Sequence, residues 1–201
     1  MSKIDTHEIK RLRELTGVGI TDAKQALVAA SGNFDEALKA MRAKGLTKAD
    51  KRSEREARCG VIGSYVHDGR IGVLIEVNCE TDFVAKNEIF TNLVKDLAMH
   101  IAASAPRFIS TDQVPADEVN RLKIEFAEKI KNEGKPEAMR AQIVDGMVSK
   151  HLNEQSLQQQ PFVKNPEQTV GDYVKETIAK LGENIVVRRF ERMALGELSD
   201  D

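Results

Sequence analysis

Residues 60–78 read Gly60-Val-Ile-Gly-Ser-Tyr-Val-His-Asp-Gly-Arg-Ile-Gly-Val-Leu-Ile-Glu-Val-Asn78, two β-rich runs joined by Asp68-Gly69. An Asp-Gly pair between two such runs favours a type I′ turn, because this turn needs positive φ at both central residues. The stretch therefore predicts an antiparallel β-hairpin with Asp68 and Gly69 at its turn.

A polar corner at residues 78–82 follows the second run, and Phe83 and Val84 stand where the next helix should begin. Large apolar side chains near water often mark contact surfaces, which makes Phe83 a candidate for binding a partner. The alternative is that Thr81 or Asp82 caps the helix and that Phe83 only packs on its first turn. Beyond the corner, apolar residues at helical spacing predict a longer helix that contains Phe90, Leu93, Val94, Leu97, Ala98 and Ile101.

Residues 4–43 predict three short helices, because apolar residues recur at helical spacing in three blocks. The first block ends at Thr16-Gly17-Val18-Gly19, the second ends at Gly32, and the third begins with Asn33 and Glu36 in a capping-box-like pair. The two glycines of the first turn follow a helix rather than a strand and lack a third glycine, so we reject a dinucleotide site there. A bundle this small buries little surface, which indicates a recognition module.

Residues 117–153 predict an antiparallel helical hairpin, a short coiled-coil arm, because two apolar stripes are separated at Gly134-Lys-Pro136. Farther along the chain, Thr169 is expected to cap a helix that Gly182 ends. Residues 184–195 then predict a last strand, which we expect to complete an antiparallel sheet with the first hairpin.

The last predicted strand loses its alternation at Arg188 and Arg189, which suggests an edge or solvent-facing strand. The fold class is therefore α+β, with a three-helix bundle first and an antiparallel-sheet core with helices after it. The predicted domains are a three-helix domain at residues 1–45, a basic linker at 46–58, and a core at 59–201 with the helical hairpin inserted.

The composition limits the class of protein. The 201 residues are 41% hydrophobic and carry a formal net charge of -2, which allows a packed core and argues against a surface that binds nucleic acid as a whole. We find neither a signal peptide nor an apolar run of membrane-span length, so we expect a cytoplasmic protein without membrane contact.

Cys59 and Cys79 fit a reducing compartment and are expected to pack as small apolar side chains. Basic residues gather between Lys44 and Arg58, which leaves a nucleic-acid contact as an alternative.

The common motifs of catalysis are missing from the sequence. It contains neither a Walker phosphate-binding motif nor a Gly-x-Ser-x-Gly elbow, and its four histidines lack paired metal-ligand spacing. We therefore expect no enzyme, no metal ion and no cofactor. His100 lies near the end of its predicted helix, where the helix dipole favours a cation.

Several separated segments, in the same order and over nearly the whole chain, resemble one family, elongation factor Ts. This chain has one sheet-forming hairpin, whereas longer members of the family carry two copies of the core. The matching segments are Leu12-Arg-Glu-Leu-Thr-Gly-Val-Gly-Ile-Thr-Asp-Ala-Lys-Gln-Ala-Leu27, residues 77–87, His100-Ile-Ala-Ala-Ser104, Gln160-Pro-Phe-Val163, Thr169-Val-Gly171 and Gly182-Glu-Asn-Ile-Val-Val-Arg-Arg189.

The resemblance implies a guanine-nucleotide exchange factor that promotes GDP release from the GTPase elongation factor Tu. By analogy with the family, Asp82 and Phe83 enter the partner beside its Mg²⁺ and displace the elements that hold the metal ion and the phosphates. Thr81 and Val84 would shape this tip. The action needs no covalent catalysis, so the resemblance implies no catalytic residue.

The resemblance also implies how the chain meets its partners. The first three helices would form a ubiquitin-associated-like bundle that docks on elongation factor Tu through Arg13, Ile20, Thr21 and Lys24. The short form of the family pairs as a homodimer, and a symmetric dimer is the commonest closed assembly. Two other classes of protein remain alternatives, a nucleic-acid-binding protein and an adaptor in which the bundle alone binds a helix.

Overall fold

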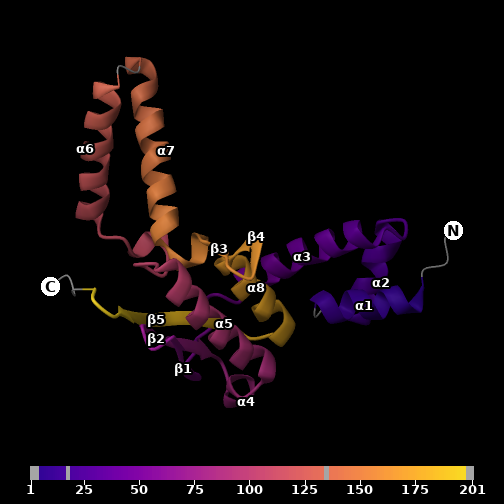
Figure 1. Cartoon of the computed structure of the whole chain (residues 1–201). Helices are drawn as coiled ribbons and strands as arrows, with labels where there is room; N and C mark the ends of the chain where they lie inside the picture. The colour runs from indigo at the N-terminus through magenta and orange to yellow at the C-terminus, as the bar shows by residue number, and fades with distance from the viewer. Residues whose placement is uncertain (1–4, 17–18, 134–135, 198–201) are drawn as a thin grey trace. The chain divides into compact units, whose positions relative to one another are not determined.

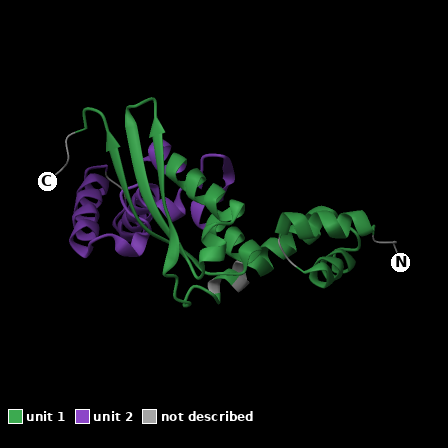
Figure 2. Cartoon of the chain, turned by 90° about the horizontal axis from the view of Figure 1, so that it is seen from below, with its two compact units in different colours: residues 1–99, 172–201 green, residues 100–171 purple. Residues whose placement is uncertain are grey.

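The computed structural model describes residues 5–16, 19–133 and 136–197. The chain forms two compact units, one of residues 1–99 with 172–201 and the other of residues 100–171 (Figure 2). In the described part of the chain, no helix has the length and apolar character needed to cross a membrane.

The first unit begins with three helices, α1 (Thr6–Thr16), α2 (Ile20–Ala29) and α3 (Phe34–Asp50), as the sequence predicts. The predicted start of α3 is confirmed, because the Asn33 side-chain oxygen accepts hydrogen bonds from the backbone N–H groups of Asp35 and Glu36. The turn at residues 17–18 lies outside the described residues. The core of the bundle consists of Ile9, Leu12, Ala23, Leu27, Ala37 and Met41.

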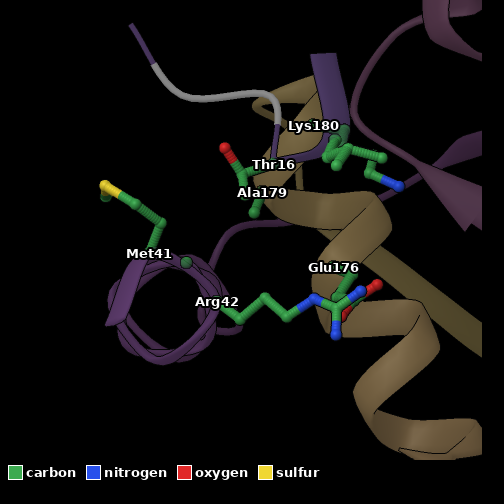
Figure 3. Close-up of a pocket in the computed structure, with 8 residues that line it drawn as sticks. Thr16, Met41, Arg42, Glu176, Ala179 and Lys180 are labelled. Atoms are coloured by element: carbon green, nitrogen blue, oxygen red, sulfur yellow. The ribbon is translucent and has the colours of Figure 1, made fainter. Parts of the chain in front are cut away.

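Helix α3 is longer than the sequence predicts, since it continues through residues 46–50, which were expected in the basic linker. Packing explains the extension. Gly45 is buried, and a Cβ placed there would lie 3.4 Å from the Cβ of Ala179, so α3 contacts helix α8 (Val170–Leu181) closely. Arg42 also forms an ion pair with Glu176 at 3.4 Å (Figure 3). Tertiary contacts of this kind stabilise a helix whose own sequence pattern is weak.

The predicted hairpin is confirmed. Strands β1 (Cys59–His67) and β2 (Ile71–Cys79) pair antiparallel, and the turn between them has positive φ at Asp68 (49°) and Gly69 (65°). Strand β5 (Ile185–Ala194) pairs antiparallel with β2, so the sheet order is β1-β2-β5 (Figure 1). The last strand thus lies at an edge of the sheet, as predicted.

A β-bulge explains why the alternation of β5 is interrupted. Glu76 of β2 lies opposite Arg189, whereas the next residue, Val77, lies opposite Val187. Arg188 is therefore the extra residue of the bulge, and the side chains on either side of it change faces. The sequence shows the interruption, but only the register identifies its cause.

One face of this sheet is covered by helix α5 (Glu88–Ser104). Its predicted apolar residues are all buried, and a Cβ placed on Gly63 of β1 would lie 2.3 Å from Cγ1 of Val94. Glycine therefore lets α5 approach the strand. The opposite face of the sheet carries large apolar side chains that remain exposed, namely Ile62, Val66, Leu74 and Met193.

The second unit contains the predicted helical hairpin, α6 (Ala116–Asn132) and α7 (Glu137–Gln155), which lie side by side (Figure 1). Its interior contains Ile130, Val144 and Val148, and the half-buried residues packed around them are Val119, Leu122, Phe126, Ile143, Met147 and Leu152. The break at Gly134-Lys135 lies outside the described residues. The unit also contains the short helices η1 (Thr111–Gln113) and η2 (Leu157–Gln159) and the strands β3 (Pro161–Phe162) and β4 (Asn165–Thr169). Thr169, the predicted cap of α8, is the last residue of β4.

The prediction that His100 is a cation near a helix end is wrong. It is fully buried in the second unit, and its Nε2–H group donates to Oε1 of Gln160 at 2.9 Å. Its Nδ1 atom accepts a hydrogen bond from the backbone N–H of Val163 at 3.3 Å. Burial lowers the pKa of the imidazole, so His100 is neutral and joins α5 to the segment around β3.

Candidate functional site

The polar corner leads into a single helical turn, α4 (Asp82–Ala85), which carries the candidate tip residues. Thr81 has extended backbone angles and caps α4, because its Oγ1 atom accepts a hydrogen bond from the backbone N–H of Val84 at 3.4 Å. The predicted alternative is therefore right about the cap. It is wrong about Phe83, whose side chain is 89% exposed and cannot be packed on the turn.

The end of α4 that leads into α5 is attached to the core by packing and by a second helix cap. Ala85 is buried and Val84 is half-buried, so the turn is anchored on the side away from Phe83. After α4, the side chain of Asn87 accepts a hydrogen bond from the backbone N–H of Ile89 at 2.8 Å and caps the start of α5. Phe83 thus lies between two capped helix starts, in a segment with little freedom to rearrange.

A carboxylate from a distant turn holds the other side of the corner. Glu183 lies between α8 and β5, and its Oε2 atom accepts hydrogen bonds from the backbone N–H groups of Glu80 at 3.1 Å and Thr81 at 3.0 Å. Its Oε1 atom accepts a third bond from the Thr81 hydroxyl at 2.7 Å. One side chain therefore binds three donors of the corner.

The interaction between the two turns is reciprocal. Oε1 of Glu80 accepts a hydrogen bond from the backbone N–H of Asn184 at 2.6 Å, and Glu80 also pairs with Arg55 at 3.5 Å. The side-chain amide of Asn184 donates to the carbonyl oxygens of Ser53 at 3.2 Å and Arg55 at 2.6 Å. The segment before β1, the corner and the turn before β5 thus form one hydrogen-bonded network.

The sequence did not identify Glu80, Glu183 or Asn184 as site residues. Glu183 and Asn184 fall inside a segment that resembles the elongation factor Ts family, and this was the one signal available. Their partners lie more than a hundred residues away along the chain, so no local pattern could connect them.

The two cysteines lie beside the corner, directly opposite each other across β1 and β2. Cys79 is buried, and its thiol donates to the carbonyl oxygen of Thr81 at 3.2 Å. Burial is the main cause that raises the pKa of Cys79 to about 11. Burial also raises the pKa of Cys59, followed by the charge of Asp82. Both groups are protonated thiols at neutral pH and serve as small buried or half-buried side chains.

The four candidate docking residues lie on the three-helix bundle. Arg13 is exposed in the last turn of α1, while Ile20, Thr21 and Lys24 are exposed at the start of α2. Ile20 is 58% exposed although it is a large apolar residue. These positions flank the same inter-helix turn, so the structure gathers them on one end of the bundle.

The site presents an exposed apolar side chain on an ordered turn. Phe83 is the most exposed of the large apolar side chains in the described chain, and it stands on a turn whose backbone groups are held on both sides. Within the described ranges, no three His, Cys, Asp or Glu residues are placed to hold a metal ion. Large exposed apolar groups often mark contact surfaces, so this arrangement is typical of the class of proteins that bind other macromolecules.

Comparison with known proteins gives the family. The family model described as Elongation factor TS matches residues 2–197, so the chain belongs to the elongation factor Ts family. Elongation factor Ts of Alkaliphilus metalliredigens is 49% identical over 189 residues, which cover 94% of this chain and 88% of the relative. Elongation factor Ts of Citrifermentans bemidjiense is 46% identical over 195 residues, or 96% of this chain and 90% of that relative. The protein of the same name from Desulfosudis oleivorans is 47% identical over 198 residues, or 98% of this chain and all of the relative.

Proposed function

We propose that the chain is a guanine-nucleotide exchange factor that promotes GDP release from elongation factor Tu during polypeptide elongation. The observation that carries this proposal is the 89% exposure of Phe83 on a turn whose corner donates three hydrogen bonds to Glu183. An aromatic side chain held out in this way loses little conformational freedom when it enters a partner, because its supporting backbone is already ordered.

The tip acts as a wedge. A GTPase holds GDP through backbone amides and through Mg²⁺, whose octahedral shell tolerates little displacement. Phe83 enters beside this shell together with Asp82, while Thr81 and Val84 fix the shape of the tip. Burial of one Phe side chain contributes roughly 1.5–3 kcal/mol, which corresponds to about one to two powers of ten in an equilibrium constant.

This amount is too small to release a tightly bound nucleotide, so other contacts must act with the wedge. The bundle docks through Arg13, Ile20, Thr21 and Lys24 and places the tip at the nucleotide site. Docking that is equally strong to the GDP-bound and the empty partner would not shift the equilibrium. The coupling is reciprocal, so the incoming nucleotide weakens the binding of the exchange factor by the same factor. The exchange is therefore catalytic without a covalent step.

A nucleic-acid-binding function is not favoured by the segment between Lys44 and Arg58. Three of its cations have carboxylate partners, namely Lys44 with Asp22 at 3.1 Å, Arg55 with Glu80 at 3.5 Å and Arg58 with Glu56 at 2.6 Å. These pairs reduce the positive charge that the segment could present to phosphates.

We also propose that the chain forms a homodimer through the open face of its sheet. Ile62, Val66, Leu74 and Met193 are exposed on the three strands of this face, whereas α5 covers the other face. A second copy would present the same four side chains, so a two-fold axis over the sheet would bring apolar surface against apolar surface. The resemblance to short members of the family, which it implies are homodimers, supports the proposal.

The test of the exchange function is the release of fluorescent GDP from purified elongation factor Tu with catalytic amounts of this protein. We expect the wild-type chain to accelerate release and Phe83→Ala to lose most of the acceleration. Leu195→Ala is the matched control, because Leu195 is also an exposed apolar residue but lies beyond the far end of β5. Unchanged GDP release in the presence of the wild-type protein would refute the proposed function, and full activity of Phe83→Ala would refute the wedge.

A further inference from the structure

The corner that carries the tip is held by a carboxylate that belongs to another part of the unit. We propose that Glu183 is a positioning residue for nucleotide exchange, whose carboxylate fixes the backbone of Glu80 and Thr81 and thereby the direction in which Phe83 projects. This inference rests on the proposed exchange function and adds to it a residue that acts through the tip rather than on the partner.

The first argument concerns the hydrogen bonds of the corner. Strand β2 ends at Cys79 and α4 begins at Asp82, so the backbone N–H groups of Glu80 and Thr81 belong to neither element. Both groups donate to Oε2 of Glu183, at 3.1 Å and 3.0 Å. A charged acceptor shared by two successive amides fixes the peptide plane between them, and this plane sets the direction in which α4 starts.

The second argument concerns the hydroxyl group of Thr81. A hydroxyl has one proton to donate, and here it donates to Oε1 of Glu183 at 2.7 Å. Its lone pairs are then turned toward the backbone N–H of Val84, from which it accepts a bond at 3.4 Å. The orientation that makes Thr81 a cap is therefore imposed by Glu183, and the cap ends on the residue next to Phe83.

The third argument is that packing does not position the Phe83 side chain itself. The Phe83 side chain is 89% exposed, so its position depends on the backbone of α4 alone. Oε1 of Glu80 in turn accepts a hydrogen bond of 2.6 Å from the backbone N–H of Asn184, so each turn has a carboxylate that binds the backbone of the other. A recognition group on a single helical turn keeps its geometry only when its supporting residues are themselves held in this manner.

A residue that only stabilised the fold would also lie at such a junction, and the two roles make different predictions. If Glu183 acts through the tip, its removal lowers the maximal rate of GDP release and leaves the concentration for half-maximal effect nearly unchanged, because docking depends on the bundle. It also has no further effect once Phe83 is absent. If Glu183 is only structural, its removal lowers the melting temperature and affects exchange equally with or without Phe83.

The experiment measures GDP release from elongation factor Tu over a range of concentrations of the wild-type chain, Glu183→Ala, Phe83→Ala and the double variant. We expect Glu183→Ala to lower the maximal rate by about tenfold or more, since small misplacements of a positioned group have effects of this order. We expect less than about a twofold further loss in the Phe83→Ala background, as for two residues that act as one unit. Glu197→Ala is the control. Glu197 follows the end of β5 that lies away from the corner, and its carboxylate pairs with Arg192 at 2.8 Å.

Two conservative variants and a spectroscopic measurement complete the test. Glu183→Gln retains an oxygen for both amides, and its N–H group can donate to the Thr81 hydroxyl oxygen, which keeps a second lone pair for the backbone N–H of Val84, so this variant should keep most of the activity. Glu183→Asp keeps the charge but not the reach, so it should behave like Glu183→Ala and serves if the alanine variant does not fold. The chain has no Trp, so Phe83→Trp introduces a single indole whose fluorescence anisotropy reports the mobility of the tip. Glu183→Ala and Glu183→Asp should lower this anisotropy, whereas Glu183→Gln should not.

The outcomes separate the two proposals. A wild-type chain without effect on GDP release refutes the exchange function and this inference with it. An active wild-type chain with an equally active and equally rigid Glu183→Ala variant refutes the inference alone. An equal loss in the presence and absence of Phe83 also refutes it, because Glu183 would then act on the whole fold.

Discussion

His100 donates a hydrogen bond of 2.9 Å from Nε2 to Oε1 of Gln160 inside the second unit, where both side chains are buried. The Gln160 amide also donates to the carbonyl oxygens of Ser104 at 3.4 Å and Glu154 at 2.7 Å. Nε2 faces the Gln160 acceptor and Nδ1 faces the backbone N–H of Val163, so the imidazole is neutral and carries its proton on Nε2. The network joins the end of α5 to the segments on both sides of η2.

The neutral state of His100 predicts a dependence of stability on pH. Burial lowers the pKa of His100 below its ordinary value of 6.5, so the unfolded chain takes up a proton more readily than the folded chain. The stabilisation is therefore complete above pH 6.5 and decreases as the pH falls toward the lowered pKa. We expect urea unfolding followed by circular dichroism to give a lower midpoint at about pH 5 than at about pH 7.5.

His100→Gln is the control for this pH effect. The Gln side chain cannot be protonated. It also loses the hydrogen-bond geometry of the imidazole, so the free energy of unfolding should fall by about 1–3 kcal/mol at every pH. The decrease between neutral and acidic pH should be smaller than in the wild-type chain. The same decrease in both proteins would show that other groups, and not His100, cause it.

The docking role of Ile20 gives a second prediction. Ile20→Ala removes an apolar side chain that is 58% exposed, so the fold should be unaffected while contact with elongation factor Tu is lost. We expect the concentration for half-maximal GDP release to rise by about three- to tenfold, as for loss of roughly 1 kcal/mol of binding. The maximal rate should stay the same, because the tip is intact.

Val28→Ala is the matched control for Ile20, because Val28 is 57% exposed on the same helix but near its other end. It should leave both the half-maximal concentration and the maximal rate unchanged. Equal losses for the two variants would mean that α2 docks along its whole length or that neither residue is specific to the contact.

Gly63 gives a prediction about the fold alone. Gly63→Ala places a methyl group 2.3 Å from Cγ1 of Val94, so α5 must move away from β1 or the side chain must rearrange. We expect a loss of about 1–3 kcal/mol in the free energy of unfolding, which is typical of overpacking in a core. Gly146→Ala is the control, since nothing lies within 4 Å of the added Cβ in helix α7, and it should raise stability by about 0.5–1 kcal/mol. Thermal unfolding monitored by circular dichroism measures both, and an undiminished melting temperature for Gly63→Ala would contradict the close packing.

The sequence predicts the parts of this fold whose signals are local. The Asp68-Gly69 turn, the Asn33 cap and the apolar stripe of α5 each depend on neighbouring residues, and all three are confirmed. Phe83 was also identified as an exposed aromatic residue from its place after a strand and a polar corner.

The features that the sequence did not predict depend on residues far apart in the chain. Helix α3 continues past Gly45 because Ala179 lies against it, and no pattern between residues 46 and 50 reveals that contact. Burial lowers the pKa of His100, although its position near the end of α5 alone favours a cation, and its contacts Gln160 and Val163 lie 60 and 63 residues away along the chain. Glu183 reaches Thr81 across 102 residues, so the support of the tip is visible only in three dimensions.

The homodimer gives the last prediction. Leu74 is exposed in β2, the middle strand of the sheet, so Leu74→Asp would place a charge near the centre of the proposed interface. A buried and unpaired charge costs several kcal/mol, about enough to dissociate a dimer of micromolar affinity or weaker. We expect analytical ultracentrifugation to give twice the monomer mass for the wild-type chain and the monomer mass for Leu74→Asp. Ile124→Asp, at an exposed apolar position on α6, should remain dimeric. A monomeric wild-type chain at tens of micromolar would contradict the dimer, and dissociation by Ile124→Asp instead would move the interface to the helical hairpin.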